Sequence, residues 1–195
     1  MNELRSAQSS REEGQALPEF ALVIPLFLLV VFGIIQLGFL LAGQNGLTNA
    51  TREAARYAST LPTPDISVAG TCAAAGSNAE LVYTRLKTVN LPQYIPGIQP
   101  ANIVSGSGAL SGCATWAQSG TGTGVAYCKR DNGDSTWSIR VRVRVVYAHP
   151  LFIPLVGRIF SSTNTLQLGA VEEMRVEGPN RSSTSASLGG FATCP

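Results

Sequence analysis

The sequence predicts an α+β fold, in which a long N-terminal transmembrane and amphipathic α-helix precedes a small extracytoplasmic domain with a short helix and an antiparallel β-sheet. Three observations predict this fold: an apolar run of membrane length, a helical repeat that continues beyond it, and strict alternation in a later segment. We divide the chain into a leader at residues 1–14, a helix at 15–60, a domain at 61–178 and a flexible tail at 179–195.

The apolar run is long enough to cross a bilayer. From Leu22 to Leu41 every residue is Leu, Ile, Val or Phe, apart from Pro25, Gly33, Gln36 and Gly38. Twenty helical residues rise about 30 Å, which is the thickness of a hydrocarbon core. The large apolar side chains favour insertion by about 5 to 10 kcal/mol in total. We therefore predict a transmembrane segment at residues 21–42, rather than the buried core helix of a soluble protein.

The helical pattern continues past the apolar run. Leu47, Ala50 and Ala54 recur at helical spacing, and charged side chains lie mostly on the other face of the helix. The sequence Pro62-Thr63-Pro64 then ends the helix, because proline has no backbone N–H to donate. The apolar segment of a secretory signal is usually shorter and is removed with the signal. The amphipathic extension at residues 43–60 therefore favours a helix that the protein retains.

The cysteines determine the orientation that we predict. Arginines flank the apolar run equally on both sides, so the positive-inside rule gives no answer. All four cysteines follow the helix, as expected for an oxidising compartment. We predict a single-pass inner-membrane protein with a cytoplasmic N-terminus and a periplasmic or extracellular C-terminal domain. Spacing favours a Cys113–Cys128 disulfide, whose loop of about 16 residues is worth about 3 kcal/mol, and leaves Cys72–Cys194; free thiols are the alternative.

Composition argues against catalysis and against nucleic-acid binding. The chain has 14 basic and 12 acidic residues, whereas nucleic-acid-binding domains carry basic patches. Its single histidine, His149, has no Cys or Ser partner in its sequence context, and the cysteine spacings match no zinc pattern. We therefore expect no enzymatic activity, no metal, no cofactor and no small-molecule substrate.

Two later segments predict paired antiparallel strands. Residues 137–147 alternate strictly, and the inward face consists of Trp137, Ile139, Val141, Val143, Val145 and Tyr147. Residues 166–176 form the partner strand, with Leu166, Leu168, Ala170, Met174 and Val176 inward. Glu173 and Glu177 could lie across from the arginine face, which we define as Arg140, Arg142 and Arg144. This face is either solvated or a contact for anionic lipid headgroups or a partner protein.

The region between the helix and these strands is less regular. A short helix is expected to begin at Asn78, to turn Leu81, Leu86 and Val89 inward, and to end before Pro92. Residues 105–124 are rich in Gly, Ser and Thr and predict flexible loops.

A carboxylate directly before the apolar run gives the strongest functional signal. Glu19 and Phe20 lie at the start of the membrane-length segment, where a charge is costly without a partner. Cleavage after Gly14 would create such a partner, the α-amine of Gln15. Alternatively, Glu19 simply marks the membrane interface.

The first 60 residues also resemble a known family. The segments that carry the resemblance are Gly14-Gln15-Ala16, Glu19-Phe20, the apolar run, and Leu47-Thr48-Asn49-Ala50-Thr51-Arg52-Glu53-Ala54-Ala55-Arg56-Tyr57-Ala58. Together they are similar to the TadE/TadG-like pseudopilins of the tight-adherence (Flp) pilus system. The sequence Val146-Tyr147, Pro150-Leu151-Phe152, Pro154 and the strand ending Met174-Arg175 resemble the family's C-terminal pattern.

The resemblance implies a specific function. A prepilin peptidase would cut between Gly14 and Gln15, so residues 1–14 would be a prepilin-type leader and Glu19 the fifth residue of the mature chain. The product would be a minor pilin or pseudopilin-like subunit of a Tad-type (type IVb) pilus used in adherence, packed through its N-terminal helix. Its partners would be the peptidase, other pilins, Tad assembly-platform proteins and membrane lipid.

Physical chemistry supports a pairing role for Glu19 and leaves one alternative function. An α-amine has a pKa near 7.7–8.0 when unperturbed, and a buried amine and carboxylate are each costly unless they pair. Pairing between chains would fix the axial register of a filament. Glu12-Glu13 stands where many family members have a basic residue. The alternative is therefore an uncleaved single-pass envelope protein whose periplasmic domain binds a protein partner.

Overall fold

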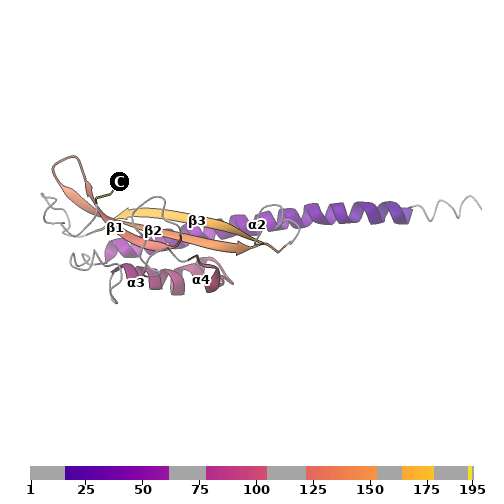
Figure 1. Ribbon diagram of the computed structural model, residues 1–195, viewed down its shortest axis with the longest axis horizontal. Coiled ribbons are helices and arrows are strands. Elements are labelled where there is room, and N and C mark those ends of the chain that lie inside the picture. The colour runs from indigo at the N-terminus through magenta and orange to yellow at the C-terminus, as the bar shows by residue number, and fades with distance from the viewer. Residues whose placement is uncertain (1–15, 62–77, 105–121, 153–163, 178–192, 195) are drawn as a thin grey trace, which may run out of the picture. The chain divides into compact units, whose positions relative to one another are not determined.

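The computed structural model describes residues 16–61, 78–104, 122–152, 164–177 and 193–194. Its main elements are α2 (Ala16–Thr60), α3 (Asn78–Arg85), a π-helical turn (Leu86–Asn90), α4 (Leu91–Tyr94), a 3₁₀ turn (Pro100–Asn102), β1 (Gly124–Asp131), β2 (Trp137–Pro150) and β3 (Thr165–Arg175) (Figure 1). The described strands form one antiparallel sheet in the order β1-β2-β3. The predicted fold class, a long apolar helix followed by a small α+β domain, is confirmed.

The chain forms two compact units. Among the described residues, the first unit contains α2 up to Phe39 together with Leu151, Phe152 and Asn164, and the second contains the rest. The helix α2 runs without a break through Pro25, and its described part is Ala16–Thr60; the predicted start at Gln15 lies outside the described residues. The proposed division into leader, helix, domain and tail remains a prediction.

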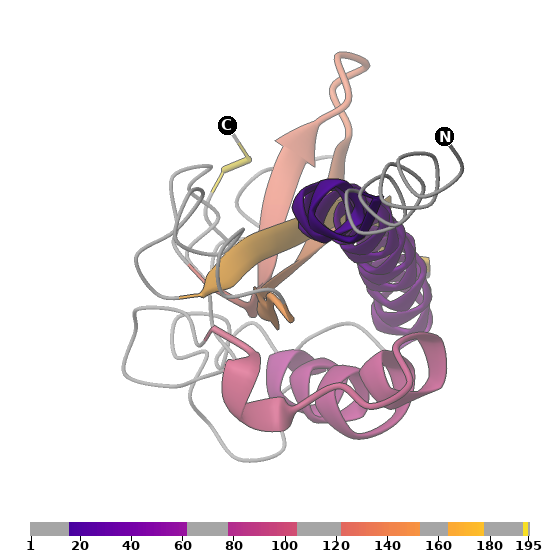
Figure 2. The ribbon, with the colours of Figure 1, turned by 90° about the vertical axis from the view of Figure 1, so that its right-hand side faces the viewer.

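The second unit is built around one hydrophobic core. The sheet, the C-terminal part of α2 and the α3–α4 segment all contribute to it, and Figure 2 shows these parts around their common interior. Fully buried core side chains include Leu47, Ala54, Leu86, Leu91, Ile139, Val141, Val143 and Val145. The alternation predicted for residues 137–147 and 166–176 is confirmed, since the apolar side chains of β2 and β3 line this core.

Small residues let α2 approach its neighbours closely. Ala50, Ala54 and Ala58 lie one turn apart and are fully buried. Gly46 extends the same row, and a Cβ atom there would lie only 2.6 Å from the carbonyl oxygen of Tyr94. The helix therefore contacts the end of α4 through its backbone at Gly46.

The structure corrects the predicted short helix. Leu86 is fully buried as expected, but Leu81 and Val89 are each 45% exposed. Ala79, Val82 and Tyr83 take their place in the core. The chain also remains helical past Pro92: the N–H of Leu91 bonds the carbonyl of Leu86, and this π turn shifts the register so that α4 begins at Leu91 with proline in its first turn.

The strand β1 was not predicted. Within β1, the side chains of Val125 and Tyr127 face the core. Those of Ala126 and Cys128 lie on the other face of the strand and pack with Cys194. Because both faces are covered, apolar residues occur at consecutive positions and the alternation typical of a half-buried strand is absent. The preceding residues 105–121, for which we expect loops, lie outside the described residues.

Candidate functional site

The helix α2 begins with the residues that the sequence marks as functional. Glu19 lies in its first turn, where the helix dipole favours a negative charge, and both Glu19 and Phe20 are exposed. The predicted cleavage position between Gly14 and Gln15 lies outside the described residues. Nothing in the described first turn buries or covers the Glu19 carboxylate, so it is accessible to a partner.

A large apolar surface follows Glu19 along the helix. The side chains exposed by at least 60% are Leu17, Phe20, Leu22, Val23, Leu26, Phe27, Ile34, Leu37 and Leu41. Only 6% of the most apolar stretch of this helix is buried within the structure. Among the described residues, one helix is therefore long and apolar enough to span a membrane, and its most apolar stretch is almost entirely exposed.

Gln36 is the exception on this apolar surface. It is only 3% exposed, and its Oε1 accepts a hydrogen bond of 2.9 Å from the backbone N–H of Phe152. The ring of Phe152 stacks at a tilt on Phe39, with ring centroids 5.7 Å apart. Neither Gln36 nor Phe152 was predicted to have a functional role, although a polar amide within an apolar run is itself a signal that a partner is needed.

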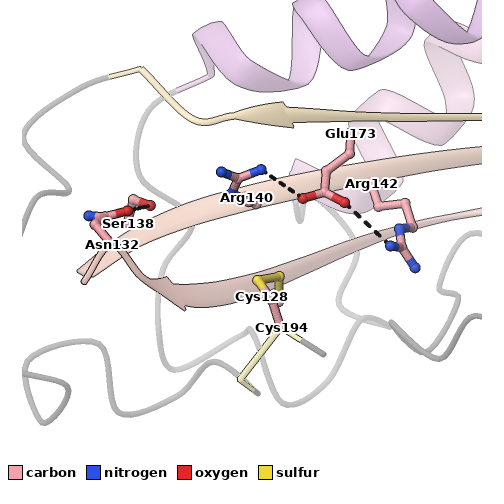
Figure 3. Close-up of a disulfide and its surroundings, with 7 residues drawn as sticks. All are labelled: Cys128, Asn132, Ser138, Arg140, Arg142, Glu173 and Cys194. Carbon is pink, nitrogen blue, oxygen red and sulfur yellow. Dashed lines mark hydrogen bonds and ion pairs between the residues drawn. A yellow bond between two sulfur atoms is a disulfide. The ribbon is translucent and has the colours of Figure 1, made fainter. Parts of the chain in front are cut away.

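The arginine face is partly neutralised within the chain. Arg140 Nη1 and Arg142 Nη2 donate to the two carboxylate oxygens of Glu173, at 3.0 and 3.3 Å (Figure 3). These side chains are 31%, 18% and 26% exposed, so the cluster is half-buried. The predicted position of Glu173 opposite the arginines is confirmed. The pairing favours a structural role for Arg140 and Arg142, and it leaves Arg144 as the third, half-buried member of the face.

A further ion pair connects α2 to the sheet. Arg52 Nε lies 3.7 Å from Glu172 Oε2, and the Arg52 side chain is 61% exposed. An exposed pair of this kind contributes little stability. Near it, Gln44 Nε2 donates to the carbonyl of Gly169 at 2.8 Å, which adds a polar contact between the same two elements.

The structure corrects both predicted disulfides. Cys128 on β1 bonds Cys194, so neither Cys113–Cys128 nor Cys72–Cys194 is formed (Figure 3). The spacing argument preferred the shortest loop, but the contact is made by the strand: Thr193 bridges Lys129 in parallel, and Cys194 donates its N–H to the Lys129 carbonyl. Cys72 and Cys113 lie outside the described residues.

His149 lies at the end of β2 in an apolar setting. Its ring contacts that of Tyr147 edge-on at 6.0 Å, and a Cβ at Gly43 would lie 3.6 Å from Nδ1. Both ring nitrogens are buried without a hydrogen-bond partner in the described structure. Burial lowers the pKa of His149 below its ordinary value. This environment fits a ring that packs against its neighbours.

Metal binding has no support in the described ranges. No group of three or more His, Cys, Asp and Glu side chains comes together there in a way that could hold a metal ion.

Comparison with known proteins gives one match. No curated protein and no solved structure shows significant similarity to the chain. The family model described as TadE-like protein matches residues 14–56, a range that begins at the predicted cleavage position and ends within α2. The resemblance stated from the sequence is therefore confirmed for this segment: residues 14–56 are similar to the TadE-like family.

Proposed function

We propose that this chain is a minor pilin or pseudopilin-like subunit of a Tad-type pilus, cut by a prepilin peptidase between Gly14 and Gln15 and packed through its N-terminal helix. One observation carries the proposal: the family match begins at Gly14, and α2 then presents an exposed Glu19 followed by an exposed apolar surface. A subunit that packs through its helix needs Glu19 and the apolar surface of that helix to be uncovered by the rest of its own chain.

The packing mechanism rests on charge pairing in an apolar environment. Among packed helices, the Glu19 carboxylate and the α-amine of Gln15 would each be costly alone and much less costly together. Pairing between neighbouring subunits selects one axial offset, because only that offset places amine beside carboxylate. The apolar side chains from Leu22 to Leu41 then supply contact area without specifying register.

The proposed orientation places the C-terminal domain on the oxidising side of the inner membrane. The Cys128–Cys194 disulfide supports this, since such bonds persist in the periplasm and outside the cell and are rare in the cytoplasm. The proposed partners are the prepilin peptidase, other pilins, the Tad assembly platform and membrane lipid. The filament or its assembly site would serve adherence.

N-terminal sequencing of the protein from strains with and without prepilin peptidase tests the processing step. We expect the mature chain to begin at Gln15 only where the peptidase is present, and Gly14→Leu to leave the chain intact in both strains. An intact Met1 end in both strains for the unmodified protein would instead indicate the uncleaved envelope protein whose domain binds a partner.

Glu19→Ala tests the pairing step separately. We expect the variant to insert into the membrane and to accumulate normally but to abolish piliation, because the register-setting charge is gone. Glu53→Ala is the matched control, since Glu53 is a carboxylate on the same helix outside the apolar run. Normal piliation of the Glu19→Ala strain, seen by electron microscopy, would remove the pairing mechanism.

A further inference from the structure

The contact between Gln36 and Phe152 joins a residue inside the predicted membrane segment to a residue far away in the sequence. Gln36 is six residues before Ala42, the end of the predicted membrane segment, so it lies about 9 Å inside that end at 1.5 Å per residue. Phe152 follows β2 directly in sequence and belongs to the same compact unit as this part of the helix. If α2 spans the membrane there, Phe152 lies at the same depth.

Two backbone donors at this position are bonded within the protein. Non-helical backbone is tolerated in the hydrocarbon region only where it is covered by protein or lines a water-filled cavity, so that its polar groups do not face lipid. The N–H of Phe152 donates to Gln36 Oε1 at 2.9 Å, and that of Leu151 donates to the carbonyl of Asn164 at 2.9 Å. Both donors are therefore satisfied without water.

The side chains at the contact are apolar and face outward. Phe152 is 69% exposed, and its stacking partner Phe39 is 53% exposed. Phe32 and Ile35 on the preceding turns of α2 are 49% and 48% exposed. An uncharged aromatic surface beside two bonded backbone donors suits acyl chains.

We propose that the segment Leu151-Phe152 is a second membrane contact of this protein, with the Phe152 ring among lipid acyl chains and its backbone held against α2 by Gln36. The ligand is the bilayer itself, in the leaflet that holds residues 32–42. The role of Gln36 is to bond the Phe152 N–H so that this piece of chain can enter the lipid. The inference depends on α2 spanning the membrane, and it is independent of cleavage and pilus assembly.

Depth measurement by spin labelling tests the proposal. A nitroxide at Phe152→Cys, on the full chain in phosphatidylethanolamine–phosphatidylglycerol vesicles, is compared for its collisions with oxygen and with a polar nickel chelate. Labelling is done without reductant, so that cysteines in disulfides do not react, and the unmodified protein gives the background. Leu29→Cys in the apolar run and Leu81→Cys on α3 are the reference positions, with side chains that are each 45% exposed.

We expect the label at position 152 to collide with oxygen and to be shielded from the nickel chelate, as at position 29. Collision with the chelate at the level of position 81 would overturn the proposal. So would shielding from both reagents, because protein rather than lipid would then cover the ring. If the label at position 29 also contacts the chelate, α2 does not span the bilayer, and the failure lies with the membrane assignment.

The role of Gln36 is tested with Gln36→Leu in the labelled chain. We expect the label at position 152 to move toward the aqueous phase, because the Phe152 N–H loses its acceptor. Gln44→Leu is the matched control: Gln44 lies two turns further along α2 and also bonds a backbone group, the carbonyl of Gly169. An unchanged depth in Gln36→Leu, or an equal shift in both variants, would show that Gln36 does not hold the segment.

Discussion

At the scale of single residues, the functional signals are polar groups in apolar surroundings. Glu19 and Gln36 both belong to the membrane-length helix, but their side chains differ in burial. Glu19 is exposed and lacks a cover, whereas Gln36 is buried against Phe152. The first fits a contact between chains and the second a contact within the chain. His149 is a third such group, and burial lowers its pKa below the ordinary value.

The burial of His149 predicts how stability responds to pH. Its pKa is lowered in the folded chain, so below about pH 6.5 the unfolded chain binds a proton that the folded chain does not. The free energy of unfolding should therefore fall as the pH drops below about 6.5. Above that pH, His149 should cause no such loss of stability. Urea unfolding of the detergent-solubilised protein at pH 7.5 and 5.5, followed by tryptophan fluorescence, measures the change.

His149→Phe is the variant that isolates this effect. It keeps an aromatic ring beside Tyr147 and removes the titrating group, so the difference between pH 7.5 and 5.5 should shrink. If the variant loses as much stability between the two pH values as the unmodified protein, another group causes the dependence.

At the scale of elements, small side chains on one face of α2 allow neighbouring elements to pack close to its backbone. Gly46, Ala50, Ala54 and Ala58 form a row of small residues one turn apart, and the α4 end contacts the row at Gly46. Close backbone contact gives little room for any added atom, because folded interiors are packed at crystal-like density.

Gly46→Ala tests this contact. The added Cβ would lie 2.6 Å from the Tyr94 carbonyl oxygen and 2.7 Å from Ile95 Cγ1, so we expect a loss of about 1–3 kcal/mol in unfolding free energy. Gly38→Ala is the control on the same helix: among the described residues, nothing beyond the helix's own nearby backbone lies within 4 Å of the position that its Cβ would take, and alanine favours helix. Equal stability of the two variants in urea unfolding would contradict the close approach.

Elements could be predicted from sequence where one face is buried and the other is not. The strands β2 and β3 follow from alternation alone, and α2 follows from composition and length. The strand β1 could not be predicted, because Ala126 and Cys128 are covered as well as Val125 and Tyr127. The predicted inward face of the short helix was wrong at Leu81 on α3, where Ala79, Val82 and Tyr83 are buried instead. It was also wrong at Val89, which lies in the π turn, where the chain leaves the α-helical register.

At the scale of the whole molecule, the disulfide connects positions far apart in sequence. Cys128 and Cys194 are separated by 66 residues, and the chain-entropy model assigns about 4 kcal/mol to closing such a loop. The pairing depends on where β1 places Cys128, which is why spacing alone led to the wrong partner. The remaining cysteines, Cys72 and Cys113, can pair within one chain only with each other.

Peptide mapping without reductant checks this pairing in protein isolated from cell membranes. We expect one peptide pair that joins Cys128 to Cys194 and a second that joins Cys72 to Cys113. The double variant Cys128→Ser, Cys194→Ser should unfold about 4 kcal/mol more easily by the same model. Full reaction of all cysteines with a thiol reagent before reduction would overturn both the pairing and the proposed oxidising location.

The single helix α2 has a consequence for how the protein could be divided. Its buried core residues begin at Leu47, and its exposed large apolar side chains end at Leu41, so the two roles of the helix do not overlap along the sequence. A chain shortened to start at Leu40 would keep every fully buried core residue that the helix contributes and lose almost all of the helix's exposed apolar side chains. Such a shortened chain is therefore a candidate for crystallisation in water.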